Sequence, residues 1–445
     1  MRRSWVCALL LALVGACFQL PIAHAQAPAA PAAPSDPVIE QLKSADVGKR
    51  VQAARELGKR GDPAIVPVLA AALSDSSEKV RREVIVALAS LRSPASFDPL
   101  ISATRDRDPK VRTLAVQALT GYYTGEVPST GFTGFVQRTW RRAKGRFVEE
   151  NVRIDPGVTV EPKVISALIE TMNDTRAIEA SRKAANGLGI LMAQAAVPDL
   201  VKAANSADTD LAVEALIALA KIKDQSAGPQ LINLLDSDKK DVKQEAAVTV
   251  GVLHTTDALP KLQAIFENNP DLPTRERALE GLAYLGSPVS SPLFLKALFS
   301  AEKNFRTFAA EGLARSGDTK ALPDLERAAP AEKEAEARLA MQYAITALGK
   351  PDYLSAVVAE LGSKLRGNSA QAYLVELTRD SSFLPRLYPF MNSQDSDVRR
   401  RLCTVLMFTG DATSVEHLEH LSHDRNGDVA TEAARALRAV RLRKS

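Results

Sequence analysis

Cysteine, strand-like patterns and net charge are all scarce in this chain of 445 residues. Two of its 3 cysteines, Cys7 and Cys17, lie within the first 25 residues, and only Cys403 remains if that segment is removed. A lone cysteine forms no intramolecular disulfide, so the chain is not a disulfide-stapled domain. Because Cys403 lies on the apolar stripe of an expected helix, we expect it to be a small buried hydrophobe.

The charge balance and the missing motifs exclude further classes. The formal charge is +4, and removing Arg2 and Arg3, with no acids in the first 25 residues, lowers it to +2. Nucleic-acid-binding domains normally carry a strong basic excess, so we expect no nucleic-acid partner. The sequence contains no G-x-S-x-G elbow, no P-loop and no G-x-G-x-x-G followed by a βαβ unit. We therefore expect neither an enzyme nor a cofactor.

What the chain does contain is a repeat of about 31 residues, which indicates a solenoid or array. A pattern close to V-R-x-x-A-x-x-A-L returns along the chain, for example at Val80 to Leu88 and at Val111 to Leu119. Aligned leucines or valines mark its end in each unit: Leu57, Leu88, Leu119, Leu188, Leu219, Val250, Leu282, Leu313, Leu348, Leu377, Leu406 and Leu437.

One unit, Asp62 to Leu91, shows what each repeat is built from. Gly61 before Asp62 and Pro63 is typical of a helix C-terminus followed by an N-cap and a first-turn proline. Apolar residues then follow a helical period in two runs, separated by the polar segment 74–77. Each repeat is therefore expected to be a helical hairpin. Since no alternating strand pattern appears, the predicted class is all-α.

The spacing and the D-x-x-V-R-x-x-A-x-x-A-L pattern resemble HEAT repeats, specifically the short bacterial type called phycobilisome-lyase-like. The resemblance covers about Pro37 to Val440 apart from one insertion. It implies an α-solenoid of about twelve stacked HEAT-like hairpins, with repeats 1–3 in 37–122 and repeats 4–12 in 162–445. Such a solenoid hosts many unrelated functions, so the resemblance predicts the fold better than the activity.

The N-terminus indicates export. Arg2 and Arg3, an apolar run and the small residues before Gln26 form the three parts of a signal peptide, predicted for residues 1–25. A Pro/Ala-rich linker follows over 26–36. The run ending at Cys17 also resembles a bacterial lipobox, in which Cys17 would be acylated. We therefore expect a periplasmic or secreted protein, with a membrane-anchored lipoprotein as the alternative.

The repeat is interrupted once, between Leu119 and Leu188, by an insertion expected to span residues 123–161. Aromatic and basic residues gather there, and the candidate contact residues are Phe132, Phe135, Arg138, Trp140, Arg141, Arg142 and Arg146. Two interpretations stay open. The aromatic face packs on the solenoid, or it docks an acidic protein partner or an anionic membrane surface.

Two further clusters have a chemical and a structural interpretation. His417, His420 and His423 have spacings that could hold a metal ion on a helix, although the sequence favours a solvated polar face. Basic residues also recur at one motif position, with acids just upstream in neighbouring repeats, and are interpreted as an inter-repeat ion-pair column or as an anion-binding ridge: Arg50, Arg81, Arg112, Lys243, Arg275, Arg306 and Arg399.

These observations favour an exported, non-enzymatic HEAT-repeat scaffold that mediates protein–protein interaction in the cell envelope. The resemblance to phycobilisome-lyase-like repeats implies an alternative, a lyase-like or chaperone activity. A second alternative is a membrane-associated adaptor that docks through the insertion.

Overall fold

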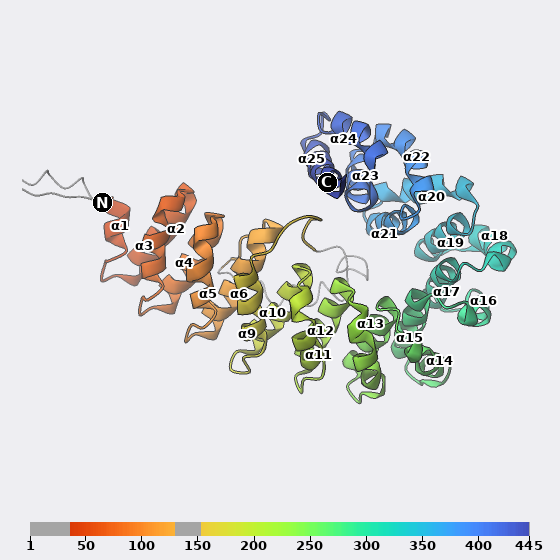
Figure 1. Cartoon of the computed structure of the whole chain (residues 1–445), viewed down its shortest axis with the longest axis horizontal. Coiled ribbons are helices and arrows are strands. Elements are labelled where there is room, and N and C mark those ends of the chain that lie inside the picture. The colour runs from red at the N-terminus through yellow and green to blue at the C-terminus, as the bar shows by residue number, and fades with distance from the viewer. Residues whose placement is uncertain (1–35, 130–152, 445) are drawn as a thin grey trace, which may run out of the picture.

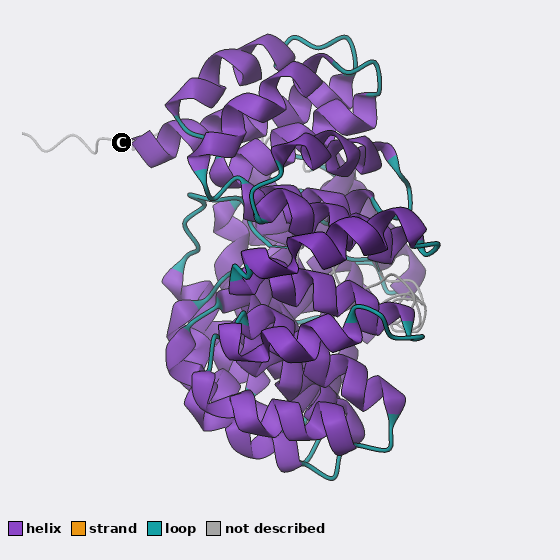
Figure 2. Ribbon diagram, turned by 90° about the vertical axis from the view of Figure 1, so that its right-hand side faces the viewer, coloured by secondary structure: helices purple, strands orange, loops and turns teal. Residues whose placement is uncertain are grey.

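In the computed structural model, which describes residues 36–129 and 153–444, the chain is a curved stack of helical hairpins. Helices make up its regular structure, and no strand occurs within these two ranges (Figure 2). The all-α solenoid expected from the repeat is therefore confirmed. The described residues form twelve hairpins, the number that the leucine spacing predicts.

The first three hairpins precede the insertion. They pair α1 (Pro37–Gln41) with α2 (Val47–Arg60), α3 (Val66–Ala72) with α4 (Glu78–Ser90), and α5 (Phe97–Ala103) with α6 (Pro109–Thr124).

Nine hairpins follow. They are α9 (Pro162–Met172) with α10 (Ile178–Ile190), α11 (Val197–Ala204) with α12 (Thr209–Ile222), η4 (Gln225–Asp236) with α13 (Lys240–Val252), α14 (Leu259–Asn268) with α15 (Leu272–Leu285), α16 (Ser291–Ala297) with α17 (Lys303–Ser316), α18 (Leu322–Ala331) with α19 (Ala335–Ala347), α20 (Leu354–Ala359) with α21 (Gly367–Leu377), α22 (Leu384–Leu387) and η11 (Tyr388–Asn392) with α23 (Ser396–Thr409), and α24 (Val415–Leu421) with α25 (Gly427–Lys444).

The ends of the helices follow the sequence signals closely. Asp46 and Asp108 are N-caps of second helices, and their carboxylates accept backbone N–H groups of the first turn. Gly61 and Gly317 end α2 and α17 with φ of 68° and 67°, a conformation that suits glycine. Gly410 differs, since its φ is −60°. A side chain there would collide with the Leu406 carbonyl, so close packing explains this glycine.

The core runs the length of the stack between the two layers of helices. Alanine and leucine positions of the motif are buried along the stack, for example Ala87 and Leu88 in α4, and Leu437 in the last repeat is partly buried. Cys403 is also fully buried, as expected, and burial raises the pKa of its thiol to about 12. Among the described residues, no helix has the length and apolar character needed to cross a bilayer.

The insertion leaves the stack uninterrupted. Helices α6 and α10, which flank it in sequence, pack against each other as neighbouring second helices do elsewhere. Further along, the stack curls back, so that α25 lies beside the middle of the chain (Figure 1). This curl brings the C-terminal hairpins close to the segment that ends the insertion.

Candidate binding surface

The aromatic and basic residues proposed for partner contact lie outside the described residues. They are Phe132, Phe135, Arg138, Trp140, Arg141, Arg142 and Arg146, all within 130–152. The described residues show instead how the insertion begins and how it ends.

The insertion begins on an aromatic cluster at the end of α6. The ring of Phe97 lies 4.7 Å from that of Tyr122 and 6.0 Å from that of Tyr123, centroid to centroid. The Tyr123 hydroxyl accepts a hydrogen bond of 3.0 Å from the backbone N–H of Glu161, the residue before α9. The two ends of the insertion are thereby joined at its base.

The insertion returns through Arg153–Gly157, which we call the return segment, and this segment contacts the C-terminal hairpins. The Arg435 guanidinium of α25 binds both oxygens of the Asp155 carboxylate, with an Nε–Oδ2 distance of 3.1 Å. The guanidinium carbon of Arg153 lies 4.1 Å from the centre of the Phe408 ring in α23. These residues are separated by more than 250 positions in the sequence.

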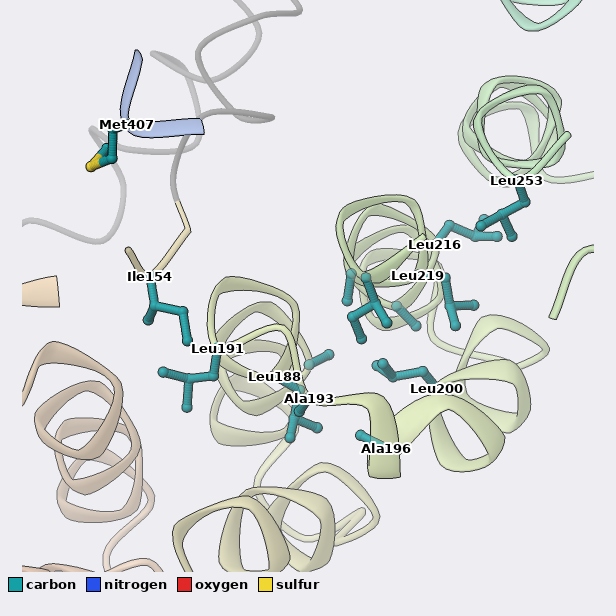
Figure 3. Packing of buried hydrophobic residues seen from close by; sticks show 14 of the residues in the cluster. Ile154, Leu188, Leu191, Ala193, Ala196, Leu200, Leu216, Leu219, Leu253 and Met407 are labelled. Atoms are coloured by element: carbon teal, nitrogen blue, oxygen red, sulfur yellow. The ribbon is translucent and has the colours of Figure 1, made fainter. Parts of the chain in front are cut away.

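The same segment is also held by the fourth hairpin. The backbone N–H of Ile154 donates a hydrogen bond of 3.0 Å to the Ile190 carbonyl, at the end of α10. The Ile154 side chain is 9% exposed and belongs to the same buried cluster as Leu191 and Met407. Figure 3 shows it beside Leu191, on the side of α10 that faces Met407 of α23. The return segment thus bridges repeat 4 and the last two repeats.

The basic column expected from the motif is present and pairs with acids of the next repeat. In α4, Arg81 Nε and Nη2 donate to the two oxygens of Asp106 at 2.8 and 2.9 Å. Its Nη1 donates to the backbone carbonyls of Asp75 and Ser76, within its own hairpin turn. One side chain therefore fixes its own turn and joins it to the following one.

Equivalent pairs recur along the stack: Arg50 with Asp75, Arg112 with Asp174, Arg182 with Asp208, Arg306 with Glu332, and Arg399 with Asp424. Arg182 escaped the sequence analysis because its repeat lacks the preceding valine. Arg275 differs, since its Nε donates to the Phe266 carbonyl, and Lys243 forms no such pair in the described part of the chain. The hydrogen bond from Arg50 holds the pKa of the Asp75 carboxyl below its ordinary value. The structural interpretation of the column is confirmed at the arginines that form these pairs.

A second polar network is buried among α17, α19 and α21, and the sequence analysis missed it. Arg315 donates to both oxygens of Glu376 at 2.8 and 3.0 Å, and the Tyr373 hydroxyl donates to Glu311 at 2.5 Å. The rings of Tyr343 and Tyr373 stack with centroids 4.4 Å apart. Burial alone would raise the pKa of the Glu376 carboxyl. The charge of Arg315 and hydrogen bonds from Arg315 and Tyr343 outweigh burial and hold that pKa at about 2.

The three histidines have different surroundings in the structure. The His417 ring stacks on Tyr388 with centroids 4.0 Å apart, whereas His423 Nδ1 lies 3.1 Å from the Glu419 carbonyl. His420 is exposed. Within 36–129 and 153–444, no group of three or more His, Cys, Asp or Glu side chains is arranged to hold a metal ion. Among the described residues, His417, His420 and His423 are therefore not gathered around one point, and the metal interpretation stays a prediction.

An open hollow of about 420 Å³ lies beside the return segment's docking site. Phe408 forms part of its wall, together with Arg379, Asp411 and Arg443. Arg443 is committed to the end of α23, since it donates to the carbonyls of Leu406, Met407 and Gly410. The guanidinium of Arg443 therefore caps the end of α23.

The described residues thus form an α-solenoid of stacked helical hairpins. Comparison with protein families gives matches to HEAT repeats over residues 35–120, 197–283 and 259–346, which together span more than half of the chain. The chain belongs to the HEAT-repeat family.

Solved structures with related folds include the Escherichia coli protein YibA, at 17% identity and a TM-score of 0.42, covering 63% of this chain and 91% of that one. An engineered protein gives 19% identity and a TM-score of 0.34, covering 91% and 98%. Human deoxyhypusine hydroxylase in complex with glycerol gives 16% identity and a TM-score of 0.26, covering 63% and 94%. No curated protein matches the chain.

Proposed function

We propose that the protein is an exported, non-enzymatic scaffold that binds another protein in the cell envelope. HEAT-repeat solenoids offer extended surfaces suited to large partners and peptides. The N-terminal segment 1–25 has the composition of a signal peptide, which supports a periplasmic or secreted location. The phycobilisome-lyase-like subtype rests on repeat spacing and sequence pattern, so lyase-like or chaperone activity stays a prediction from the resemblance.

The observation that carries the proposal is the way the insertion is held. Its base is closed by the hydrogen bond between Glu161 and Tyr123, and its return segment is docked on Arg435 and Phe408. The stretch between these anchors contains Trp140 and five basic residues from Arg138 to Arg146. Tryptophan and arginine are the residue types most often found at energetic centres of interfaces. We therefore place the main partner contact on this stretch.

The test is a pull-down from envelope extract with three forms of the full chain. The double variant Trp140→Ala/Arg141→Glu removes the aromatic side chain and reverses one charge of the stretch. The matched control, Arg105→Glu, reverses an exposed charge at the end of α5, outside the insertion. We expect the wild type and the control to enrich the same protein, and the double variant to lose it at an unchanged melting temperature. Equal capture by all three would refute the assignment to the insertion.

A membrane-associated adaptor is the second candidate, favoured by the lipobox-like segment ending at Cys17. Mass spectrometry of the exported protein separates the two. A mature N-terminus at Gln26 supports the unanchored scaffold, whereas an acylated Cys17 with Phe18 onward retained establishes the lipoprotein. Anionic vesicles added to the purified chain test the membrane contact directly, through a shift in the emission of Trp140.

A further inference from the structure

The return segment makes contacts that its own repeats do not require. Repeats 3 and 4 already stack through α6 and α10, and the arginine column crosses the insertion through Arg112 and Asp174. Arg153–Gly157 instead reaches helices of repeats 11 and 12, as the curl in Figure 1 allows. Solenoid repeats normally contact only their sequence neighbours. The return segment therefore makes a long-range contact, between repeat 4 and the last two repeats, that stacking of neighbouring repeats does not explain.

Four residues of the return segment face different groups. Asp155 binds Arg435 through two hydrogen bonds, and Arg153 covers the Phe408 ring. Ile154 is buried and bonded to α10. Gly157 has a φ of +85°, and a side chain on it would approach a Leu442 methyl carbon to 2.7 Å. Charge, stacking, burial and close packing thus act together at four of the five residues.

Asp155 also supplies a carboxylate of the kind that the next hairpin supplies elsewhere in the stack. In α2, Arg55 lies five residues after Arg50 and binds Glu83 of the next hairpin. Arg435 lies five residues after Ala430, at the matching place in α25, and no hairpin of the described residues follows it. Asp155 supplies the carboxylate there. The terminal hairpin is thereby capped by a segment from the middle of the chain.

We infer that Arg153–Gly157 is an intramolecular clasp, which holds the C-terminal hairpins against repeat 4 and keeps the superhelix closed. Its charged contact is partly exposed, with side-chain exposures of 40% for Arg435 and 29% for Asp155. Salt weakens contacts of this kind. The clasp therefore opens as ionic strength rises, and opening uncovers the Phe408 ring and separates Arg435 from Asp155, while Arg435 keeps its pair with Glu432. This device goes beyond the proposed function, since it is independent of what the protein binds.

Hydrogen–deuterium exchange on the full chain tests the clasp, because the Ile154 amide is one of its bonds. The variant is Arg153→Ala/Asp155→Asn, which changes only the segment and leaves every helix intact. We expect exchange in peptides covering 153–158 to accelerate about fivefold, the factor that corresponds to about 1 kcal/mol. The control Glu170→Gln removes an exposed carboxylate that pairs with Arg105, and should leave these peptides unchanged.

A second readout separates a clasp from a local contact. Small-angle scattering of the same variant, and of the wild type at high salt, should give a larger maximum dimension than the wild type at low salt. Wild-type exchange and scattering in the variant would overturn the inference. Faster exchange at an unchanged maximum dimension would also overturn it, since the contacts of the segment would then not hold the superhelix closed. The outcome of the envelope pull-down affects neither result.

Discussion

At the scale of single residues, the arginine column gives the stack its polar continuity. Arg81 is 3% exposed, and its guanidinium meets two backbone carbonyls of its own turn and the carboxylate of Asp106. Asp106 in turn accepts the backbone N–H of Asp108, the N-cap of the next second helix. A bidentate guanidinium suits this arrangement better than an ammonium group, because its donors are fixed in a plane.

Removal of one such arginine should therefore destabilise the stack. We expect Arg81→Ala to lower the free energy of unfolding by about 3 kcal/mol, because it leaves a carboxylate and two backbone carbonyls without their hydrogen-bond donor. Arg81→Lys should recover part of the loss. Arg105→Ala, which breaks an exposed pair, should have little effect. Urea unfolding followed by circular dichroism gives all three values, and similar midpoints for Arg81→Ala and Arg105→Ala would contradict this role.

The partly buried Glu376 carboxylate, whose side chain is 27% exposed, makes stability depend on pH. Its pKa in the folded chain is about 2, against an ordinary value of 4.5. The stabilisation from its ionised form is therefore fully present above about pH 4.5, and it is lost as the pH falls toward about 2. Glu376→Gln should lower the melting temperature more at pH 7 than at pH 3. Equal losses at the two pH values would show that the charge of Glu376 does not stabilise the fold.

At the scale of helices, close approach between neighbouring repeats depends on small residues. Helices α13 and α15 meet at Gly251 and Gly281, where added side chains would lie 2.2 and 2.1 Å from backbone oxygens of the partner helix. Such contacts cannot be relieved by a change of rotamer, because the obstructing atoms belong to the backbone. The distance between these two helices is therefore set by glycine.

Gly281→Ala tests this packing. Alanine stabilises a helix relative to glycine by about 1 kcal/mol. Here the steric clash should outweigh that gain, so that the free energy of unfolding of the variant falls by about 1–3 kcal/mol net. Gly427→Ala is the matched control, since nothing lies within 4 Å of the added side chain at the start of α25. Thermal melts should show a loss for Gly281→Ala and none for Gly427→Ala. A neutral Gly281→Ala would mean that the helices can separate without penalty.

Much of this helical architecture could be predicted because the repeat is local. Leucine spacing gave the number of hairpins, and Asp and Gly signals gave ends such as those at Asp46 and Gly61. The contact between Asp155 and Arg435 could not be predicted, since the two lie 280 residues apart and periodicity reports only neighbours. The network around Arg315 was missed for a related reason, because Glu311 and Arg315 lie in α17 whereas Tyr373 and Glu376 lie in α21, two repeats further along. Spacing on a helix does not fix where side-chain rings point, so the sequence could not show that His417 stacks on Tyr388.

At the scale of the whole molecule, the repeats and the insertion together make a superhelix that closes on itself. Stacking of twelve hairpins sets the curvature, and the curl brings α25 to the return segment (Figure 1). A binding surface on such a molecule is shaped by the curve as well as by side chains. The insertion lies between repeats 3 and 4, and its return segment is docked on repeats 11 and 12. The place of the proposed contact stretch therefore depends on the curvature of the stack.

The most direct test of this architecture is small-angle scattering of the purified protein at low ionic strength. A single superhelix curled back on itself predicts a scattering curve that the hooked arrangement of Figure 1 reproduces, together with a helix-dominated circular dichroism spectrum. An open rod with a maximum dimension set by the full contour of twelve stacked hairpins would contradict the closed form. So would a curve typical of two separate bodies joined by a linker at the insertion.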